Sequence, residues 1–194
     1  MKHILVIIII FPLFLVACSK SKELSKTQIK SDTELKFPGD WLGYWEGDLK
    51  IYNALGLTQT IPMAVDHQLT DTIGLYKWAI IYGEDTIAGR RDYFLRAIDA
   101  AKGFYEIDER NSILLRSFVI NDKLISTYNV GDVLISSVYT LRNNVMTFEI
   151  FAGKTDRVLT SGDTLYNGEK IPKVDSYLST GYQVATLHKK TLSN

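Results

Sequence analysis

The stretch GYWEGDLKI, from Gly43 to Ile51, decides the fold that we expect, because its side chains alternate strictly in character. Its small or apolar positions are Trp45, Gly47, Leu49 and Ile51, and the polar positions between them are Glu46, Asp48 and Lys50. A period of two is typical of a β-strand with one buried and one solvated face. The stretch therefore predicts a strand that covers a core on one side only.

The same period continues along the chain on both sides of short turns. In TIPMAVDHQL (60–69) and GLYKWAIIY (74–82) every second residue is apolar or aromatic, with His67 in one of these positions. Turn-forming sequences such as GEDT (83–86), DERN (108–111) and RNN (142–144) separate such stretches at intervals of about ten residues. Connections this short hold no crossover helix, so we expect each strand to pair antiparallel with its neighbour.

These stretches predict an all-β fold, an antiparallel up-and-down meander of about ten strands. A sheet this long tends to close or split, because open edges invite aggregation. We expect it to close into a barrel by pairing the last strand, YQVATLHKK (182–190), with the first. A two-sheet β-sandwich is the alternative. The segment from Phe151 to about Ser179 is polar and rich in Gly, Asp and Lys, and we expect it to be a long connection.

The N-terminus predicts export. Lys2 precedes an apolar run over residues 4–17, which is short for a membrane-spanning helix and suits a signal peptide. We therefore expect a signal peptide over 1–17, a flexible tether over 18–36 that is rich in Ser, Thr, Lys and Glu, and the β-barrel domain over 37–194. The alternatives are an uncleaved anchor and an ordinary signal peptide followed by an incidental cysteine.

The residues Leu15, Val16, Ala17 and Cys18 resemble the lipobox of bacterial lipoproteins. The resemblance implies a diacylglyceryl group on the Cys18 thiol, cleavage before Cys18 and acylation, for example with palmitate, of the new amine. Anchors with two or more chains hold a protein stably at a membrane. We therefore expect a lipid-anchored protein of the cell envelope, in the outer membrane of a Gram-negative bacterium. A lipidated Cys18 leaves the domain without thiol chemistry or disulfides, because the chain has no other cysteine.

Two GxW elements, Gly39-Asp40-Trp41 and Gly43-Tyr44-Trp45, resemble the start of the first strand in calycins, the group of lipocalins, fatty-acid-binding proteins and nitrobindins. The resemblance implies a calycin-like barrel whose closed end is plugged by Trp45. Nitrobindins bind haem through a histidine just before the last strand. The matching stretch here, STGYQV, has Tyr182 and no histidine, so we expect no cofactor.

The residues expected to face inward suggest a pocket for a small, largely apolar ligand, because ligand sites are mostly apolar with a few placed polar groups. These residues are Trp45, Met63, His67, Tyr76, Trp78 and Tyr93. A buried His67 would stay neutral and offer one hydrogen bond to a ligand. Alternatively, a neighbouring tyrosine or water satisfies it, or a bulge turns it outward. No metal site is expected, because His67 and His188 lie in different strands and Asp66 faces away from His67.

No catalytic residues are expected. The chain has no GxSxG elbow. Glu106, Asp108 and Glu109 offer paired carboxylates for glycoside hydrolysis, but the second half of this cluster reads first as a hairpin turn. Two further polar groups are expected to be solvated or neutralised. They are the oxygen-rich set Asp163, Asn167 and Glu169, and a basic patch of Arg90, Arg91 and Arg96 beside Glu84, Asp85 and Asp92.

The net charge of the chain bears on its partners. The chain has 22 basic and 22 acidic residues, a balance that argues against nucleic acid as a partner. The sequence therefore predicts a membrane-anchored, non-catalytic protein that binds a small apolar ligand inside a barrel. The alternative is a protein–protein interaction or structural module of an envelope complex, whose partner binds the outer face or the segment after Phe151.

Overall fold

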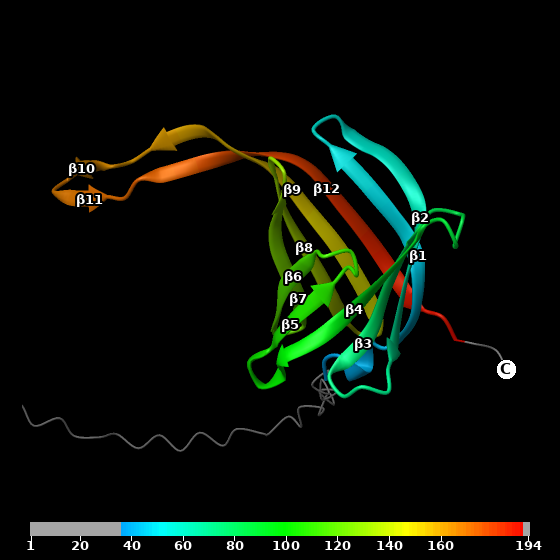
Figure 1. Cartoon of the computed structure of the whole chain (residues 1–194). Coiled ribbons are helices and arrows are strands. Elements are labelled where there is room, and N and C mark those ends of the chain that lie inside the picture. The colour runs from blue at the N-terminus through cyan, green and yellow to red at the C-terminus, as the bar shows by residue number, and fades with distance from the viewer. Residues whose placement is uncertain (1–35, 192–194) are drawn as a thin grey trace, which may run out of the picture. The chain divides into compact units, whose positions relative to one another are not determined.

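The computed structural model describes residues 36–191 and shows a closed antiparallel β-barrel (Figure 1). Two short 3-10 helices lie before β1 and after β4. The elements are η1 (Gly39–Trp41), β1 (Gly43–Asn53), β2 (Gly56–Leu69), β3 (Leu75–Tyr82), β4 (Arg90–Asp99), η2 (Ala100–Lys102), β5 (Phe104–Asp108), β6 (Leu114–Ile120), β7 (Lys123–Val130), β8 (Val133–Arg142), β9 (Val145–Ser161), β10 (Thr164–Tyr166), β11 (Glu169–Ile171) and β12 (Val174–Lys189).

The barrel contains ten strands in the order β1-β12-β9-β8-β7-β6-β5-β4-β3-β2. Closure comes from β1, which pairs with β2 on one side and with β12 on the other. The β12 pairing runs from Trp45↔Lys189 to Tyr52↔Tyr182. The predicted antiparallel meander and its closure are therefore confirmed, and the alternative of a two-sheet sandwich is wrong.

The predicted RNN turn forms a tight connection. Asn143 and Asn144 join β8 to β9 with φ angles of 52° and 58°. Two consecutive positive φ values match the twist of a β-hairpin, and asparagine tolerates them better than most residues. The RNN sequence thus fixes the register in which Arg142 faces Val145.

The inward faces of the strands meet in one core. The largest fully buried side chains include all three tryptophans, Trp41, Trp45 and Trp78. Phe148 and Leu95 join them from other parts of the barrel wall. The alternation that predicted the strands therefore also predicted which face of each strand is buried.

The expected long connection after Phe151 is wrong. β9 continues to Ser161, β10 and β11 form a terminal two-stranded sheet, and β12 already begins at Val174. We call residues 155–181 the arm, because they extend β9 and β12 beyond the pairings with β8 and β1 (Figure 1). The strands of the arm bury no face, so they lack the alternation that reveals a strand, which explains the error.

The predicted signal peptide over 1–17, Cys18 and most of the tether lie outside the described residues. Between residues 36 and 191 no helix is both long and apolar enough to cross a bilayer. The described chain enters the fold next to η1, at the end of the barrel opposite the arm (Figure 1).

Candidate functional site

Buried aromatic side chains fill the end of the barrel interior near η1, and we call this layer, which includes Trp41, Trp45 and Trp78, the floor. The Trp45 indole Nε1 donates a hydrogen bond to the Trp41 carbonyl oxygen at 3.0 Å. Phe37 covers this end, with its ring edge-on to Trp41 at 4.9 Å and to Tyr105 at 4.8 Å. The chain before β1 thus closes this end of the barrel with aromatic side chains.

His67 belongs to the floor and points inward, as its position in the alternation predicts. Its ring stacks on Trp78 with a centroid distance of 3.4 Å and an interplanar angle of 8°. Only 1% of His67 is exposed, and burial lowers its pKa to about 3. The histidine is therefore neutral at physiological pH.

The hydrogen bonding of His67 is incomplete. Its Nδ1 lies 3.4 Å from the Trp41 carbonyl oxygen, a contact that only the Nδ1-protonated tautomer can donate. That tautomer leaves Nε2 as an acceptor. Among residues 36–191, neither His67 Nε2 nor Trp78 Nε1 has a hydrogen-bond partner. Buried polar atoms are normally paired, so these two atoms are exceptions within the floor.

Above the floor, tyrosines from three parts of the wall converge. Tyr82 on β3, Tyr93 on β4 and Tyr128 on β7 influence one another's ionisation across the interior, and the deeper Tyr139 on β8 joins them. We call these four residues the tyrosine cluster. Burial raises the pKa of every member. All four hydroxyls therefore keep their protons at neutral pH and can donate hydrogen bonds.

Exposure within the tyrosine cluster changes with depth. Tyr139 is buried and its ring lies 6.1 Å from that of Trp78, whereas Tyr82, Tyr93 and Tyr128 are half-buried. Solvent therefore reaches the upper wall and not the floor. The negative charge of Glu109 raises the pKa of Tyr93 further, and the positive charge of the exposed Arg91 lowers it. The lower interior is therefore packed with buried aromatic side chains, and half-buried tyrosines line the upper wall, which we call the cup.

The structure places all six predicted pocket residues on the inward faces of their strands. Four are fully buried parts of the core, and the other two are half-buried. The buried residues are Trp45, Met63, His67 and Trp78, and the half-buried ones are Tyr76 and Tyr93. Solvent therefore reaches only Tyr76 and Tyr93 among the six.

Sequence reasoning missed Tyr128 and Tyr139 as neighbours of Tyr93. Both lie in predicted strands, and both alternate with inward serines. Ser126 pairs with Ser137 across β7 and β8, two positions from each tyrosine. Because the serines weaken the apolar pattern, the inward face of these strands was hard to recognise. The two-residue spacing was the available signal.

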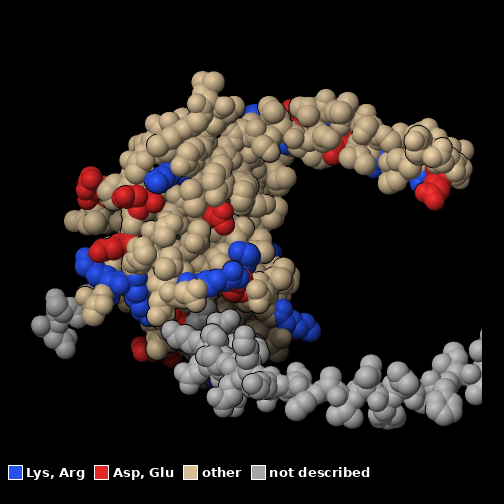
Figure 2. Space-filling model, turned by 180° about the vertical axis from the view of Figure 1, so that it is seen from behind, with Lys and Arg blue, Asp and Glu red and all other residues tan. Residues whose placement is uncertain are grey.

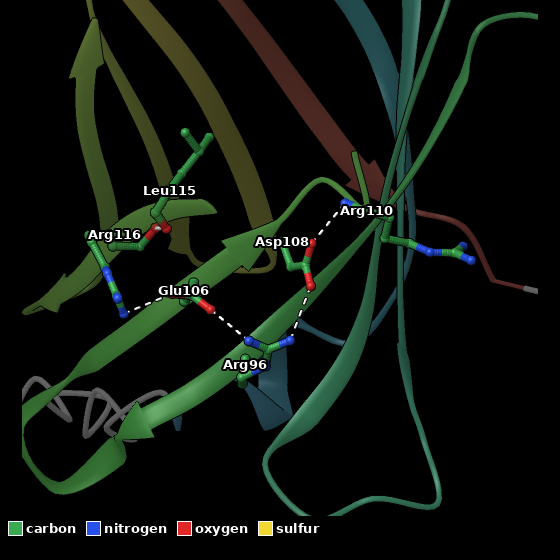
Figure 3. A network of polar contacts seen from close by, with 7 residues as sticks. Arg96, Glu106, Asp108, Arg110, Leu115 and Arg116 are labelled. Atoms are coloured by element: carbon green, nitrogen blue, oxygen red, sulfur yellow. Dashed lines mark hydrogen bonds and ion pairs between the residues drawn. The ribbon is translucent and has the colours of Figure 1, made fainter. Parts of the chain in front are cut away.

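Two of the three carboxylates considered for glycoside hydrolysis, Glu106 and Asp108, form ion pairs on the outer face of β5, whereas Glu109 accepts a hydrogen bond from Asn111 (Figure 3). The side chain of Glu106 is 3% exposed, and its two oxygens each lie 2.8 Å from a guanidinium nitrogen, one from Arg96 and one from Arg116. Arg96 also contacts Asp108 at 3.1 Å. Carboxylates held in this way are unavailable as an acid–base pair, so we assign the cluster a structural role.

The predicted basic patch of arginines does not act as one group. Arg90 forms ion pairs with Asp66 and Asp92, whereas Arg96 forms an ion pair with Glu106 and not with the predicted acids. His188 is exposed on β12. Within residues 36–191 no three His, Cys, Asp or Glu side chains are grouped so as to hold a metal ion.

A shallow groove of about 260 Å³ lies on the outer face of β1, β2 and the end of β3. Ligand pockets usually occupy roughly 300–1,000 Å³ and enclose most of the ligand. The groove falls just below this range. The residues that line it include Tyr44, Glu46, Asp48, Pro62, Ile81 and Glu84.

Comparisons with known proteins support the fold and go no further. No protein-family model matches the chain, and no curated protein matches it. A crystal structure of a protein of unknown function from the DUF3598 family of Nostoc punctiforme is similar, with a TM-score of 0.54 and 12% sequence identity. The match covers 78% of this chain and 48% of that one, so this chain spans about half the length of its structural neighbour.

Proposed function

We propose that this protein is a lipid-anchored, non-catalytic barrel that binds a small, largely apolar ligand above the aromatic floor. The lipobox-like residues support the anchor at Cys18, in the outer membrane of a Gram-negative bacterium. The calycin-like GxW elements and the closed barrel support the binding role, because calycins hold ligands in the barrel interior.

The observation that carries the proposal is the tyrosine cluster above Trp78. Apolar side chains of the wall favour an apolar ligand body, and the protonated hydroxyls favour a ligand with oxygen acceptors at one end. Arg91 at the rim favours an acceptor with partial or full negative charge. The ligand class is therefore a small amphipathic molecule with an apolar body and an acceptor oxygen.

Tryptophan quenching by a bromine-labelled medium-chain carboxylic acid tests this proposal. All three tryptophans lie in the floor, so a ligand in the cup quenches their fluorescence saturably. In a soluble form that begins at Lys36, Tyr93→Phe should weaken the apparent affinity about 5- to 10-fold, the value of one hydrogen bond. Tyr44→Phe is the matched control, because Tyr44 faces outward and should bind as the unmodified protein does. Linear, non-saturable quenching would count against an interior site.

A second candidate function is an interaction module of an envelope complex. The arm supports it, because loops and strands that project from a closed barrel are not needed to close it. Arm deletion separates the two candidates. Ligand binding should survive removal of residues 155–181, whereas an interaction role requires them.

A further inference from the structure

We propose that the floor end of the barrel docks on the surface of a bilayer that contains anionic phospholipids. The floor end comprises the strand termini and connections on the side of η1, which are residues 36–43, 69–75, 99–104, 120–123, 142–145 and 189–191. This inference goes beyond ligand binding and does not depend on it.

The floor end is the basic end of the molecule. It contains six basic and four acidic residues, whereas the rest of residues 36–191 contains 11 basic and 15 acidic residues. In the space-filling view, basic side chains gather in the lower part of the barrel, which is the floor end (Figure 2). Lys and Arg side chains near an anionic bilayer are attracted by its negative surface potential. The six basic residues are Lys36, Lys102, Lys123, Arg142, Lys189 and Lys190.

Two acidic residues of the floor end lie behind basic ones. Lys102 forms an ion pair with Asp99 at 2.8 Å, and the Lys102 side chain is 82% exposed against 36% for Asp99. Arg142 forms an ion pair with Asp122, and their side chains are 68% and 14% exposed. In both pairs the cation projects into solvent and the carboxylate does not. The surface that a bilayer would meet is therefore more basic than the residue count alone indicates.

The floor end also exposes large aliphatic side chains. Ile73 in the β2–β3 turn is fully exposed, and Leu69 at the end of β2 is 67% exposed. Ile98 beside η2 and Ile120 before the β6–β7 turn are 43% and 61% exposed. Binding at a bilayer surface strengthens with buried apolar area and with attraction to anionic lipids. The floor end offers both contributions on one surface.

The position of the chain start favours the floor end over the other end of the barrel. The described chain begins at Lys36, and a flexible segment over residues 18–36 would span about 25 Å, so an anchor at Cys18 would keep the floor end close to the bilayer. Hairpins at the other end also expose aliphatic side chains, such as Leu55, but outside the floor end acidic residues outnumber basic ones. Docking by the floor end directs the arm away from the bilayer (Figure 1).

Vesicle co-sedimentation of a form that begins at Lys36 tests the docking surface separately from acylation of Cys18. This form contains all ten barrel strands and every residue of the core, so it folds without the preceding residues. At millimolar lipid it should bind vesicles that contain phosphatidylglycerol and should bind vesicles of phosphatidylcholine alone much more weakly. Combining Lys102→Glu with Lys189→Glu should weaken binding to the phosphatidylglycerol vesicles roughly 10- to 30-fold. Ile73→Ser should weaken it roughly 5-fold, because less apolar surface enters the bilayer.

Matched controls place the same changes outside the floor end. Lys50→Glu combined with Lys170→Glu changes the net charge equally at two exposed positions, and Leu55→Ser removes an aliphatic side chain that is 96% exposed. Both controls should bind the phosphatidylglycerol vesicles as the unmodified form does. Near-ultraviolet circular dichroism of the buried tryptophans should be native-like in every variant, because all the substituted side chains are exposed.

Three results would overturn the proposal. The first is an unmodified form that stays in the supernatant with phosphatidylglycerol vesicles at millimolar lipid. The second is a control variant that weakens binding as much as its floor-end counterpart. The third is binding to native membranes that protease treatment of those membranes abolishes, without binding to pure lipid vesicles, since the surface would then belong to a protein partner.

Discussion

Burial of His67 should make the unfolding free energy of the barrel fall at acidic pH, and replacing His67 should remove this contribution. In the folded chain, burial holds the pKa of His67 near 3, whereas in the unfolded chain it returns to 6.5. Below pH 6.5 the unfolded state therefore binds a proton that the folded state does not. Unfolding becomes coupled to proton uptake, and stability falls as the pH falls.

The size of the effect follows from the pKa difference. Each pH unit between 6.5 and about 3 costs about 1.4 kcal/mol of unfolding free energy. Between pH 7.5 and pH 4.5 the contribution of His67 is therefore about 2 to 3 kcal/mol. Ionisable groups elsewhere add their own pH dependence, which a His67→Phe variant retains. Phenylalanine also keeps an aromatic ring against Trp78 and removes the unpartnered Nε2.

Urea unfolding followed by tryptophan fluorescence at both pH values measures the difference directly. The unmodified protein should lose about 2 to 3 kcal/mol more than His67→Phe over this interval. A His188→Gln variant, with its substitution on the exposed part of β12, should behave as the unmodified protein does. Equal losses in the unmodified protein and His67→Phe would refute the reasoning, because His67 would then titrate alike in both states.

Two further predictions concern barrel closure and the outer ion network, and thermal or urea unfolding measures both. A Cβ at Gly47 would lie 2.1 Å from the Thr186 carbonyl oxygen, so Gly47→Ala should separate β1 from β12 and lower the unfolding free energy by at least about 3 kcal/mol. In the control variant Gly39→Ala, the added Cβ meets nothing within 4 Å, and the loss should be less than about 1 kcal/mol. Glu106→Gln removes the charge between two arginines and should cost about 2 kcal/mol, against less than about 1 kcal/mol for Glu46→Gln at the exposed pair with Lys190.

The floor was predictable from sequence because the strands that build it have one face in water and one in the core. Trp45, His67 and Trp78 all occupy positions where strict alternation leaves a single choice of face. The stacking of His67 on Trp78 was not predictable, since the register between β2 and β3 depends on the length of the turn between them. The pairing of β2 with β3 in the structure places His67 directly opposite Trp78.

The upper wall and the arm were less predictable for different reasons. Tyr128 and Tyr139 come from strands that carry inward serines, so their alternation is weak and their shared location depends on barrel closure. The arm has no buried face on its own. Val158 and Leu159 are adjacent and both exposed, so they give no alternating pattern that predicts a strand.

Ligand binding in the barrel can be measured by native mass spectrometry of the full chain, purified from the membranes of its source organism. We expect the mass of the acylated chain from Cys18 onward plus a non-covalent small molecule, which organic solvent releases. The same adduct should be depleted when Tyr82 and Tyr93 are both replaced by phenylalanine and retained in the Tyr44→Phe control. A chain that carries only its covalent acyl groups, with no releasable adduct, would contradict ligand binding in the barrel interior.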